Sequence, residues 1–305
     1  MEAPGETFAP ETGQLYDVSL EAYLNAPGLS KSGLDRIEDC PLEFKRGESQ
    51  QTDAMAIGSL IHCLALEPDR FDDRYVLEPD PRQFPGKVPR ATKAYKEARG
   101  VVEAEHPGHE LLHLDDLEHA RALAKAIRSS GVFENLLGGD PLCERSIWFE
   151  EPVYDEEKDE LVPVLCKARP DAHREREHDI ICVDLKKTRS AHPRKFSADS
   201  ARYRYHVSAW MTSAALAAVY HKPVVWLAFV VEPQPPYKTA FYRYGSTPQA
   251  IGSAVAHRNL STWLECEKAN RWPGYNGGRI ADIEIPYWLS KETLDEQARS
   301  NPEPF

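Results

Sequence analysis

The chain has 305 residues, of which 41% are hydrophobic, 10% aromatic and 28% charged. This balance excludes a chain that is disordered throughout, and it supplies enough apolar surface for the core of one large or two small domains. The net charge of −12 argues against a protein coated in positive charge for nucleic acid, although a local basic groove stays possible. No apolar run reaches the ~20 residues of a membrane span, and the first residues carry neither a basic segment nor an apolar run. We therefore expect a cytoplasmic protein without membrane attachment.

The cysteines are scattered singly along the chain, and none forms a CxxC pair. In a chain without a secretory leader this pattern indicates reduced core thiols and disfavours a zinc ribbon or an iron–sulfur cluster. The six positions are Cys40, Cys63, Cys143, Cys166, Cys182 and Cys266.

The first half of the chain is predicted to be mainly helical. Ser30 or Ser32 is a candidate N-cap, because a hydroxyl residue precedes the apolar positions Leu34 and Ile37. The segment Met55–Leu66 reads as a buried helix in which Gly58 permits the close approach of a neighbour. The expected elements that follow are a short strand at Tyr75–Leu77, a proline-rich loop over 79–90, and helices over Thr92–Glu105 and Asp115–Ser129.

The second half of the chain predicts a sheet with two further helices. The apolar run Val224–Glu232 fits a strand buried on both faces, and Thr239–Tyr244 fits its antiparallel neighbour. The other expected elements are strands at Ser146–Phe149, Leu161–Ala172 and Asp179–Asp184, and helices at Ser200–Tyr220 and Pro248–Lys268. This order predicts a mixed α/β (α+β) protein with one core: an N-terminal arm over 1–28, a single domain over 29–290 and a tail over 291–305.

Two acidic residues and a lysine form the most informative pattern in the sequence. Asp171 is expected at the end of one strand, while Asp184 and Lys186 lie two residues apart at the end of the next and therefore point the same way. Carboxylates held together repel each other unless a cation joins them, and oxygen ligands suit Mg²⁺ or Mn²⁺. Such an ion can polarise a phosphoryl group and activate water, which Lys186 would orient or deprotonate. The alternative is two turn aspartates and a solvated lysine.

Around these residues the sequence resembles the PD-(D/E)xK nuclease superfamily and, more narrowly, the exodeoxyribonuclease VIII (RecE-type) nuclease domain of recombination systems. The resemblance runs from about residue 28 to about 290 and implies a restriction-endonuclease-like core, in which helices flank a central mixed β-sheet. The motifs that carry it are Leu29-Ser30-x-Ser32 with Cys40-Pro41, Gly58-Ser59-Leu60-Ile61-His62, Cys166-Lys167-Ala168-Arg169-Pro170-Asp171, Val183-Asp184-Leu185-Lys186-Lys187-Thr188, Tyr205-His206, Val231-Glu232 with Pro236-Tyr237, and Trp272-Pro273-Gly274-Tyr275 with Pro286-x-Trp288.

The resemblance also implies a set of site residues and a cofactor. It makes Lys186 the catalytic lysine and Asp171 and Asp184 catalytic carboxylates, and it places Glu144 near the active site, with Glu150 as a competitor for that role. One departure stands out, since Ser208 and Thr212 replace the usual glutamine and tyrosine of the later helix, which places Ser208 at the DNA contact. The implied ligands of Mg²⁺, for which Mn²⁺ can substitute, are His62, Asp171, Asp184 and the Leu185 carbonyl.

A basic run follows the lysine, and its partner is expected to be DNA. The resemblance implies a homo-oligomeric ring that degrades one strand of a linear duplex, 5′ to 3′, and hands the exposed strand to a RecT-like annealing protein. A solvated surface is the simpler explanation of the run. The residues expected to neutralise phosphates are Lys187, Arg189, Arg194, Lys195, Arg202 and Arg204.

Three alternatives stay open. The replaced residues at 208 and 212 are compatible with a nuclease-fold protein that binds DNA ends with little or no catalysis. A single-strand nuclease of the same superfamily would keep the chemistry and change the substrate. A plain α+β protein with solvated acidic residues would have neither the nuclease chemistry nor a DNA substrate.

Overall fold

The computed structural model describes residues 10–47, 53–138, 141–287 and 291. Its centre is a five-stranded mixed sheet in the order β10-β9-β8-β7-β4. Only β8 and β9 run parallel, while the other neighbours pair antiparallel. This sheet with helices on both faces confirms the predicted mixed α/β class. The strands are β4 (Leu142–Cys143), β7 (Ala172–Glu175), β8 (Ile180–Lys187), β9 (Val224–Val231) and β10 (Thr239–Arg243).

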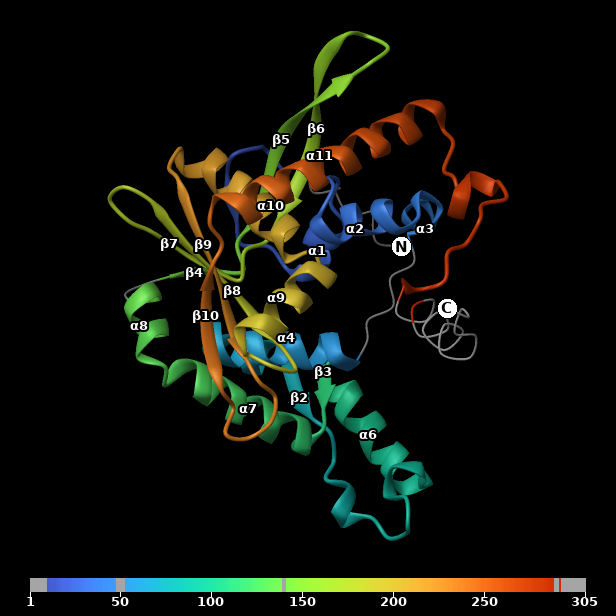
Figure 1. Ribbon diagram of the computed structural model, residues 1–305. Helices are drawn as coiled ribbons and strands as arrows, with labels where there is room; N and C mark the ends of the chain where they lie inside the picture. The colour runs from blue at the N-terminus through green and yellow to red at the C-terminus, as the bar shows by residue number, and fades with distance from the viewer. Residues whose placement is uncertain (1–9, 48–52, 139–140, 288–290, 292–305) are drawn as a thin grey trace, which may run out of the picture.

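The two central strands are buried on both faces, as the apolar run Val224–Val231 predicts. Their side chains alternate between two cores, so that Trp226 packs on one side of the sheet and Phe229 on the other. One core is closed by α10 (Tyr205–Tyr220) and α11 (Ser246–Ala269), and the other by α4 (Asp53–Leu66), α7 (Leu114–Arg128) and α8 (Gly131–Leu137) (Figure 1). The sheet thus separates two helical layers.

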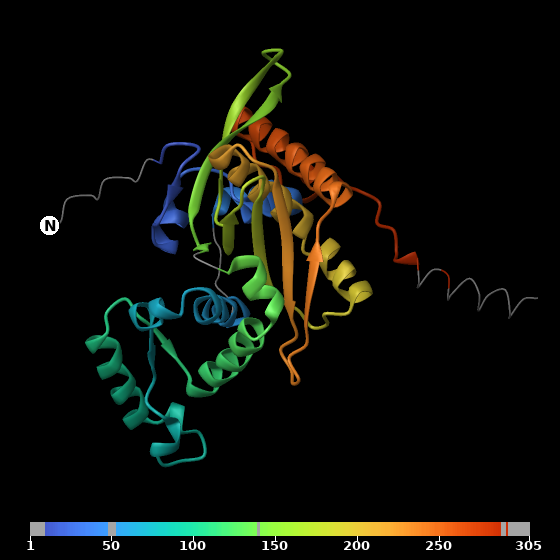
Figure 2. The ribbon, with the colours of Figure 1, turned by 90° about the vertical axis from the view of Figure 1, so that its left-hand side faces the viewer.

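A second, three-stranded sheet stands beside the first, in the order β1-β5-β6. Its long hairpin of β5 (Ser146–Asp155) and β6 (Glu160–Ala168) extends beyond the rest of the molecule (Figures 1 and 2). Strand β1 (Leu15–Tyr16) pairs with β5, and Tyr23 of helix α1 (Leu20–Asn25) packs on the buried Trp148. Residues 10–28, expected as an arm, thus lie against this sheet, whereas residues 1–9 and most of the expected tail lie outside the described residues.

The remaining elements extend the helical layers. Ser30 is the N-cap of α2, since its hydroxyl accepts the Gly33 N–H at 3.2 Å. Strands β2 and β3 form a small parallel pair next to α6, in a lobe at one end of the molecule (Figure 2). These elements are α2 (Lys31–Asp39), α3 (Pro41–Arg46), α5 (Phe71–Arg74), β2 (Tyr75–Leu77), α6 (Lys93–Glu105), β3 (Glu110–Leu112), α9 (Pro193–Arg202) and four 3₁₀ turns, η1 (Pro68–Arg70), η2 (Pro81–Gln83), η3 (Pro89–Ala91) and η4 (Tyr275–Gly278).

Three sequence predictions were wrong in detail. The strand expected over 161–172 is two strands in different sheets, broken between Ala168 and Ala172, where Pro170 has no N–H for a ladder. The helix expected over 200–220 is divided by Arg204, whose φ of 52° is left-handed. A Cβ on Gly58 would meet no atom within 4 Å, whereas one on Gly252 of α11 would lie 2.0 Å from the His206 carbonyl oxygen. Gly252 is therefore the glycine that allows two helices to approach closely.

Candidate active site

The chain passes between the two sheets twice, and each passage carries a carboxylate. Glu144 lies between β4 and β5, and Asp171 lies between β6 and β7. The Glu144 N–H donates to the Asp171 carbonyl at 3.1 Å, which fixes the passages side by side. Glu144 has a left-handed φ of 51°, a conformation that non-glycine residues seldom adopt and that concentrates at functional positions. The fold therefore holds these two carboxylates together at a strained point of the backbone.

His62 reaches this point from helix α4. Its Nδ1 lies 3.5 Å from Glu144 Oε1 and 3.7 Å from Asp171 Oδ1, and its Nε2 lies 3.2 Å from the Leu185 carbonyl oxygen. The potential ligand atoms of His62, Glu144 and Asp171 all lie within 4.8 Å of one another. The structure thus gathers three of the residues singled out in the sequence into one cluster.

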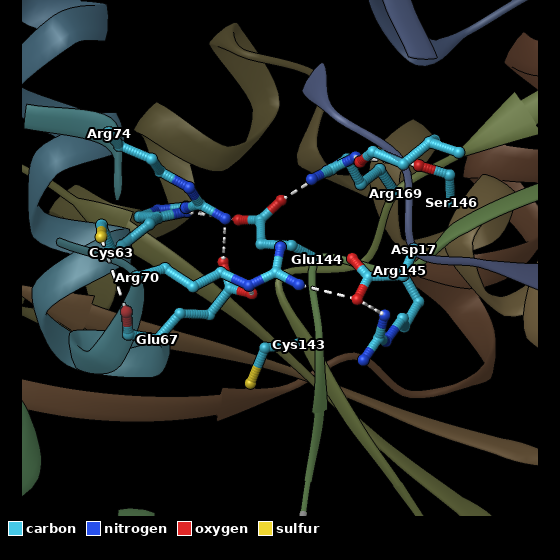
Figure 3. A network of polar contacts seen from close by, with 12 residues as sticks. Asp17, Cys63, Glu67, Arg70, Arg74, Cys143, Glu144, Arg145, Ser146 and Arg169 are labelled. Carbon is cyan, nitrogen blue, oxygen red and sulfur yellow. Dashed lines mark hydrogen bonds and ion pairs between the residues drawn. The ribbon is translucent and has the colours of Figure 1, made fainter. Parts of the chain in front are cut away.

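Hydrogen bonds hold the carboxylates of the cluster in place. The Leu185 N–H donates to Asp171 Oδ2 at 2.7 Å, across the β7–β8 hairpin. Arg169 donates to Glu144 Oε2 at 2.9 Å and also to the Ser146 hydroxyl at 3.0 Å (Figure 3). Because each carboxylate has one oxygen fixed by a donor, the other oxygen can face His62.

Asp184 and Lys186 lie beside the cluster as an ion pair. Their side chains share one face of β8, and the ammonium group of Lys186 contacts Asp184 Oδ2. The same ammonium lies 5.3 Å from the centre of the Tyr205 ring, at the start of α10. The predicted juxtaposition of this carboxylate and this amine in one place is therefore present in the structure.

Burial and neighbouring charges shift the pKa values of the cluster in opposite directions. Burial raises the pKa of Asp171 to about 6, against a smaller opposing effect of His62. Burial lowers the pKa of His62, but the charges of Asp171 and Glu144 outweigh it and raise that pKa to about 9. Burial likewise lowers the pKa of Lys186, and Asp184 and Asp171 reverse this and hold it above its ordinary value. A cation bound beside Asp171 would favour the ionised form of this buried carboxylate.

A cavity of about 1060 Å³ opens over His62 and the carboxylates of Glu144, Asp171 and Asp184. Ser208, Met211 and Thr212 of α10 form part of its wall, so the two replaced positions face the site. The predicted residues that line it are His62, Glu144, Asp171, Asp184 and Ser208.

The predicted DNA-binding residues do not line this cavity, apart from Ser208. Arg204 is engaged by α2, since it donates to Asp39 at 2.6 Å and lies 3.7 Å from Asp35. The other arginines and the second lysine of the run lie exposed on or near α9, whereas Lys187 is half-buried. Glu150, the competitor of Glu144, is exposed on β5 and is not part of the cluster.

Sequence reasoning missed a second set of basic residues that surrounds the cluster. Arg70 donates to Asp17 at 2.7 Å, Arg74 donates to Glu67 at 2.8 Å, and Arg145 also pairs with Asp17 (Figure 3). These residues come from three segments that are far apart in the chain, so no local spacing could have indicated them. The basic residues that line the cavity are Lys31, Arg70, Arg74, Lys167 and Arg169.

The chemistry of the donor set fits a divalent cation. Carboxylate oxygens suit Mg²⁺ and Mn²⁺, and an imidazole nitrogen is accepted more readily by Mn²⁺ than by Mg²⁺. His62, Glu144 and Asp171 offer two such oxygens and one such nitrogen at short mutual distances. All six cysteines are free, and none belongs to this cluster.

Comparison with solved structures supports the fold. The structure superposes with a TM-score of 0.56 on the crystal structure of the protein named "Putative exonuclease" from Eubacterium rectale, at 9% identity, over 90% of this chain and 98% of the other. At this identity the likeness shows the fold alone. A second solved protein, SSO0001, matches at a TM-score of 0.29 and 11% identity over 70% of this chain and 87% of the other. No curated protein matches the sequence.

The family comparison extends over most of the chain. Residues 30–282 match the model of a family described as a PDDEXK-like domain of unknown function (DUF3799). Within the described residues, no helix is long and apolar enough to cross a membrane. Because the match includes every element from α2 to η4 and every residue of the cluster, the chain belongs to this PDDEXK-like family and has the fold of the PD-(D/E)xK nuclease superfamily.

Proposed function

We propose that this protein is a divalent-metal-dependent nuclease that hydrolyses phosphodiester bonds of DNA. One observation carries the proposal: His62, Glu144 and Asp171 meet in a cavity that Asp184 also lines, and Asp184 is in contact with the ammonium group of Lys186. Membership in a PDDEXK-like family supports the same chemistry. An acidic cluster without a cation would repel phosphates, so the cation and the substrate are expected to bind together.

The residues divide the chemistry among them. His62, Glu144 and Asp171 would hold the ion, with Asp184 and the Leu185 carbonyl as the further ligands that the sequence predicts. When bound, the ion would polarise the phosphoryl group and activate water. Lys186, kept protonated by its carboxylate neighbours, would stabilise the negative charge that develops on the phosphoryl oxygens. Its raised pKa favours this role over that of a general base.

We further propose that the substrate is linear duplex DNA, degraded 5′ to 3′ in recombination with Mg²⁺ or Mn²⁺, as in the RecE-type enzymes that the motifs resemble. A homo-oligomeric ring and a RecT-like annealing partner belong to the same proposal. Support comes from the order and spacing of the sequence motifs. The replacements at Ser208 and Thr212, which both line the cavity, favour a weakly active DNA-end-binding protein as the second candidate.

An assay with strands labelled separately at each end tests activity, polarity and substrate form together. We expect Mg²⁺-dependent release of nucleotides from the 5′ end of a blunt duplex, and its loss in EDTA and in His62→Ala. Glu150→Gln is the matched control, because it removes an exposed carboxylate outside the cluster and should leave the rate unchanged. DNA binding without cleavage in either metal would replace hydrolysis by end binding, and cleavage of single strands alone would overturn the duplex substrate.

A further inference from the structure

Two arginines converge on a single carboxylate oxygen at the edge of the candidate active site. Arg70 donates to Asp17 Oδ2 at 2.7 Å, and Arg145 contacts the same oxygen (Figure 3). Arg145 directly follows Glu144 of the cluster, and Arg70 ends the 3₁₀ turn η1, which follows the helix of His62. Two guanidinium groups around one anionic oxygen is the arrangement with which proteins hold phosphates.

The carboxylate between these arginines is not needed to hold its own segment. The segment around Asp17 is already fixed by other bonds, since Gly13 N–H donates to the Trp148 carbonyl at 2.8 Å and Arg169 donates to the Val18 carbonyl at 2.9 Å. Lys167 adds three bonds to the end of α1, to the carbonyl oxygens of residues 23, 24 and 26. The Asp17 side chain can therefore leave the arginines without releasing the segment.

All three groups are partly open to solvent, and two of them also line the cavity. The side chains of Asp17, Arg70 and Arg145 are 41%, 39% and 26% exposed. Asp17 and Arg70 line the same cavity as His62 and Asp171. Among the described residues, Arg145 has no carboxylate partner besides Asp17, whereas Arg70 also lies 3.6 Å from Glu67. If Asp17 moved away, the positive charge of Arg145 would be left for another anion.

We propose that Arg70 and Arg145 form a binding subsite for a nucleic-acid phosphate beside the metal cluster, and that Asp17 occupies it until that phosphate displaces the carboxylate. The inference rests on the proposed function, because the cavity must admit DNA. Asp17 then acts as a built-in competitor that weakens binding of DNA whose phosphate does not reach both arginines. The ligand is either the terminal 5′-phosphate or a phosphate within the strand, since both have the same charged oxygens.

Fluorescence anisotropy with a labelled duplex tests the subsite without relying on cleavage. In EDTA, cleavage is absent and the metal-free cluster weakens DNA binding in every variant alike. Against that common baseline we expect Asp17→Asn to tighten Kd about fivefold to tenfold and to steepen its salt dependence by about one phosphate contact. Arg145→Ala should weaken binding about tenfold, and adding Asp17→Asn to it should change Kd less than twofold. Arg145→Lys keeps the positive charge, so it should retain part of the affinity that Arg145→Ala loses. It also serves as the test of the subsite if Arg145→Ala folds poorly.

The control is Asp179→Asn, which makes the same charge change at an ion pair with Arg176 in the turn between β7 and β8. The proposal would be overturned if Asp17→Asn increased the affinity for DNA no more than Asp179→Asn does. It would also be overturned if Asp17→Asn increased the affinity as much in the Arg145→Ala background as in the wild type. A gain confined to duplexes with a 5′-phosphate identifies the terminal phosphate, and an equal gain on 5′-hydroxyl duplexes identifies one within the strand. Tightening by Asp17→Asn without cleavage in any metal would leave the subsite standing and refute the hydrolytic function.

Discussion

Replacing Asp171 with Asn should stabilise the metal-free protein while removing its response to metal. The pKa of the Asp171 carboxyl group is about 6 in the folded chain and 3.8 ordinarily, so its ionised form is less favourable in the folded chain than in the unfolded one. This difference corresponds to about 3 kcal/mol at neutral pH, which is an upper limit because His62 responds to the same change. Asn keeps an oxygen for the Leu185 N–H at the same position. We therefore expect the free energy of unfolding of the variant to be about 1–3 kcal/mol larger than that of the wild type. Each kcal/mol should raise Tm by about 2–4 °C.

The pH dependence of this difference has a definite sign. The pKa of Asp171 is raised on folding, so the folded state binds more protons than the unfolded state between pH 3.8 and about 6. Wild-type stability should fall relative to the variant as pH rises through this window. Above it the difference should widen further, because the wild type also loses the stabilisation of charged His62 between pH 6.5 and about 9, and Asp171→Asn removes the charge that raises the pKa of His62 most. Below pH 3.8 both states are protonated and the gap should close. A series ending at pH 6 limits the comparison to Asp171, because His62 is then charged in the folded wild type, where its pKa is about 9, and mostly charged in the unfolded chain, where its ordinary pKa is 6.5.

Urea denaturation in EDTA at several pH values measures the difference in stability between the wild type and Asp171→Asn. Thermal melts with added Mn²⁺ measure the response of each protein to metal. Mn²⁺ binds the folded state, so it should raise the Tm of the wild type and leave Asp171→Asn unchanged. Asp179→Asn is the matched control, because Arg176 holds the pKa of Asp179 below its ordinary value and this variant should not gain stability. A variant at Asp171 that is less stable than the wild type at pH 6, or a gap independent of pH, would refute the reasoning.

Further predictions concern catalysis and packing. Lys186→Met should lower the cleavage rate about 10²–10³-fold with little change in Kd for DNA, as measured by single-turnover kinetics; an unchanged rate would remove the lysine from the mechanism. Gly252→Ala should destabilise the protein by several kcal/mol, because its Cβ would lie 2.0 Å from a carbonyl oxygen, whereas Gly58→Ala should stabilise it by up to about 1 kcal/mol in the same urea titration. Equal effects at the two glycines would contradict the packing argument. Lys167→Met should lower Tm, because three carbonyl oxygens would lose their donor; an unchanged Tm would show that water replaces it.

The central sheet was predictable because its strands are apolar and short. The run Val224–Val231 predicts a strand buried on both faces, and the structure confirms it with Thr239–Arg243 as its antiparallel neighbour. Pro170 marks the break after Ala168 in the sequence, but the change from one sheet to the other at that point is a tertiary effect that no local pattern predicts. The left-handed Arg204, which divides the two helices, gives no signal in composition either.

The site was predicted in part, for reasons that lie in its construction. His62, Asp171 and Asp184 carry recognisable motifs, and the structure places them around one cavity. Their roles as ligands stay predictions. The basic run around Arg194 was expected there and lies elsewhere, because α9 leads it away from the cavity. Pairs such as Asp17 with Arg145 join segments more than a hundred residues apart, and only the folded chain brings them together.

The cluster joins elements that lie far apart in the chain and in different layers of the fold. His62 belongs to α4 on one side of the central sheet, while Glu144 and Asp171 belong to the passages between the two sheets. An ion bound by all three would act as a crosslink, so helix and strands could not separate without first losing it. Amide hydrogen exchange in α4 and in β7 should then slow to a common rate when Mn²⁺ is added. The exchange rate of the α4 amides would therefore report whether the reaction centre is assembled.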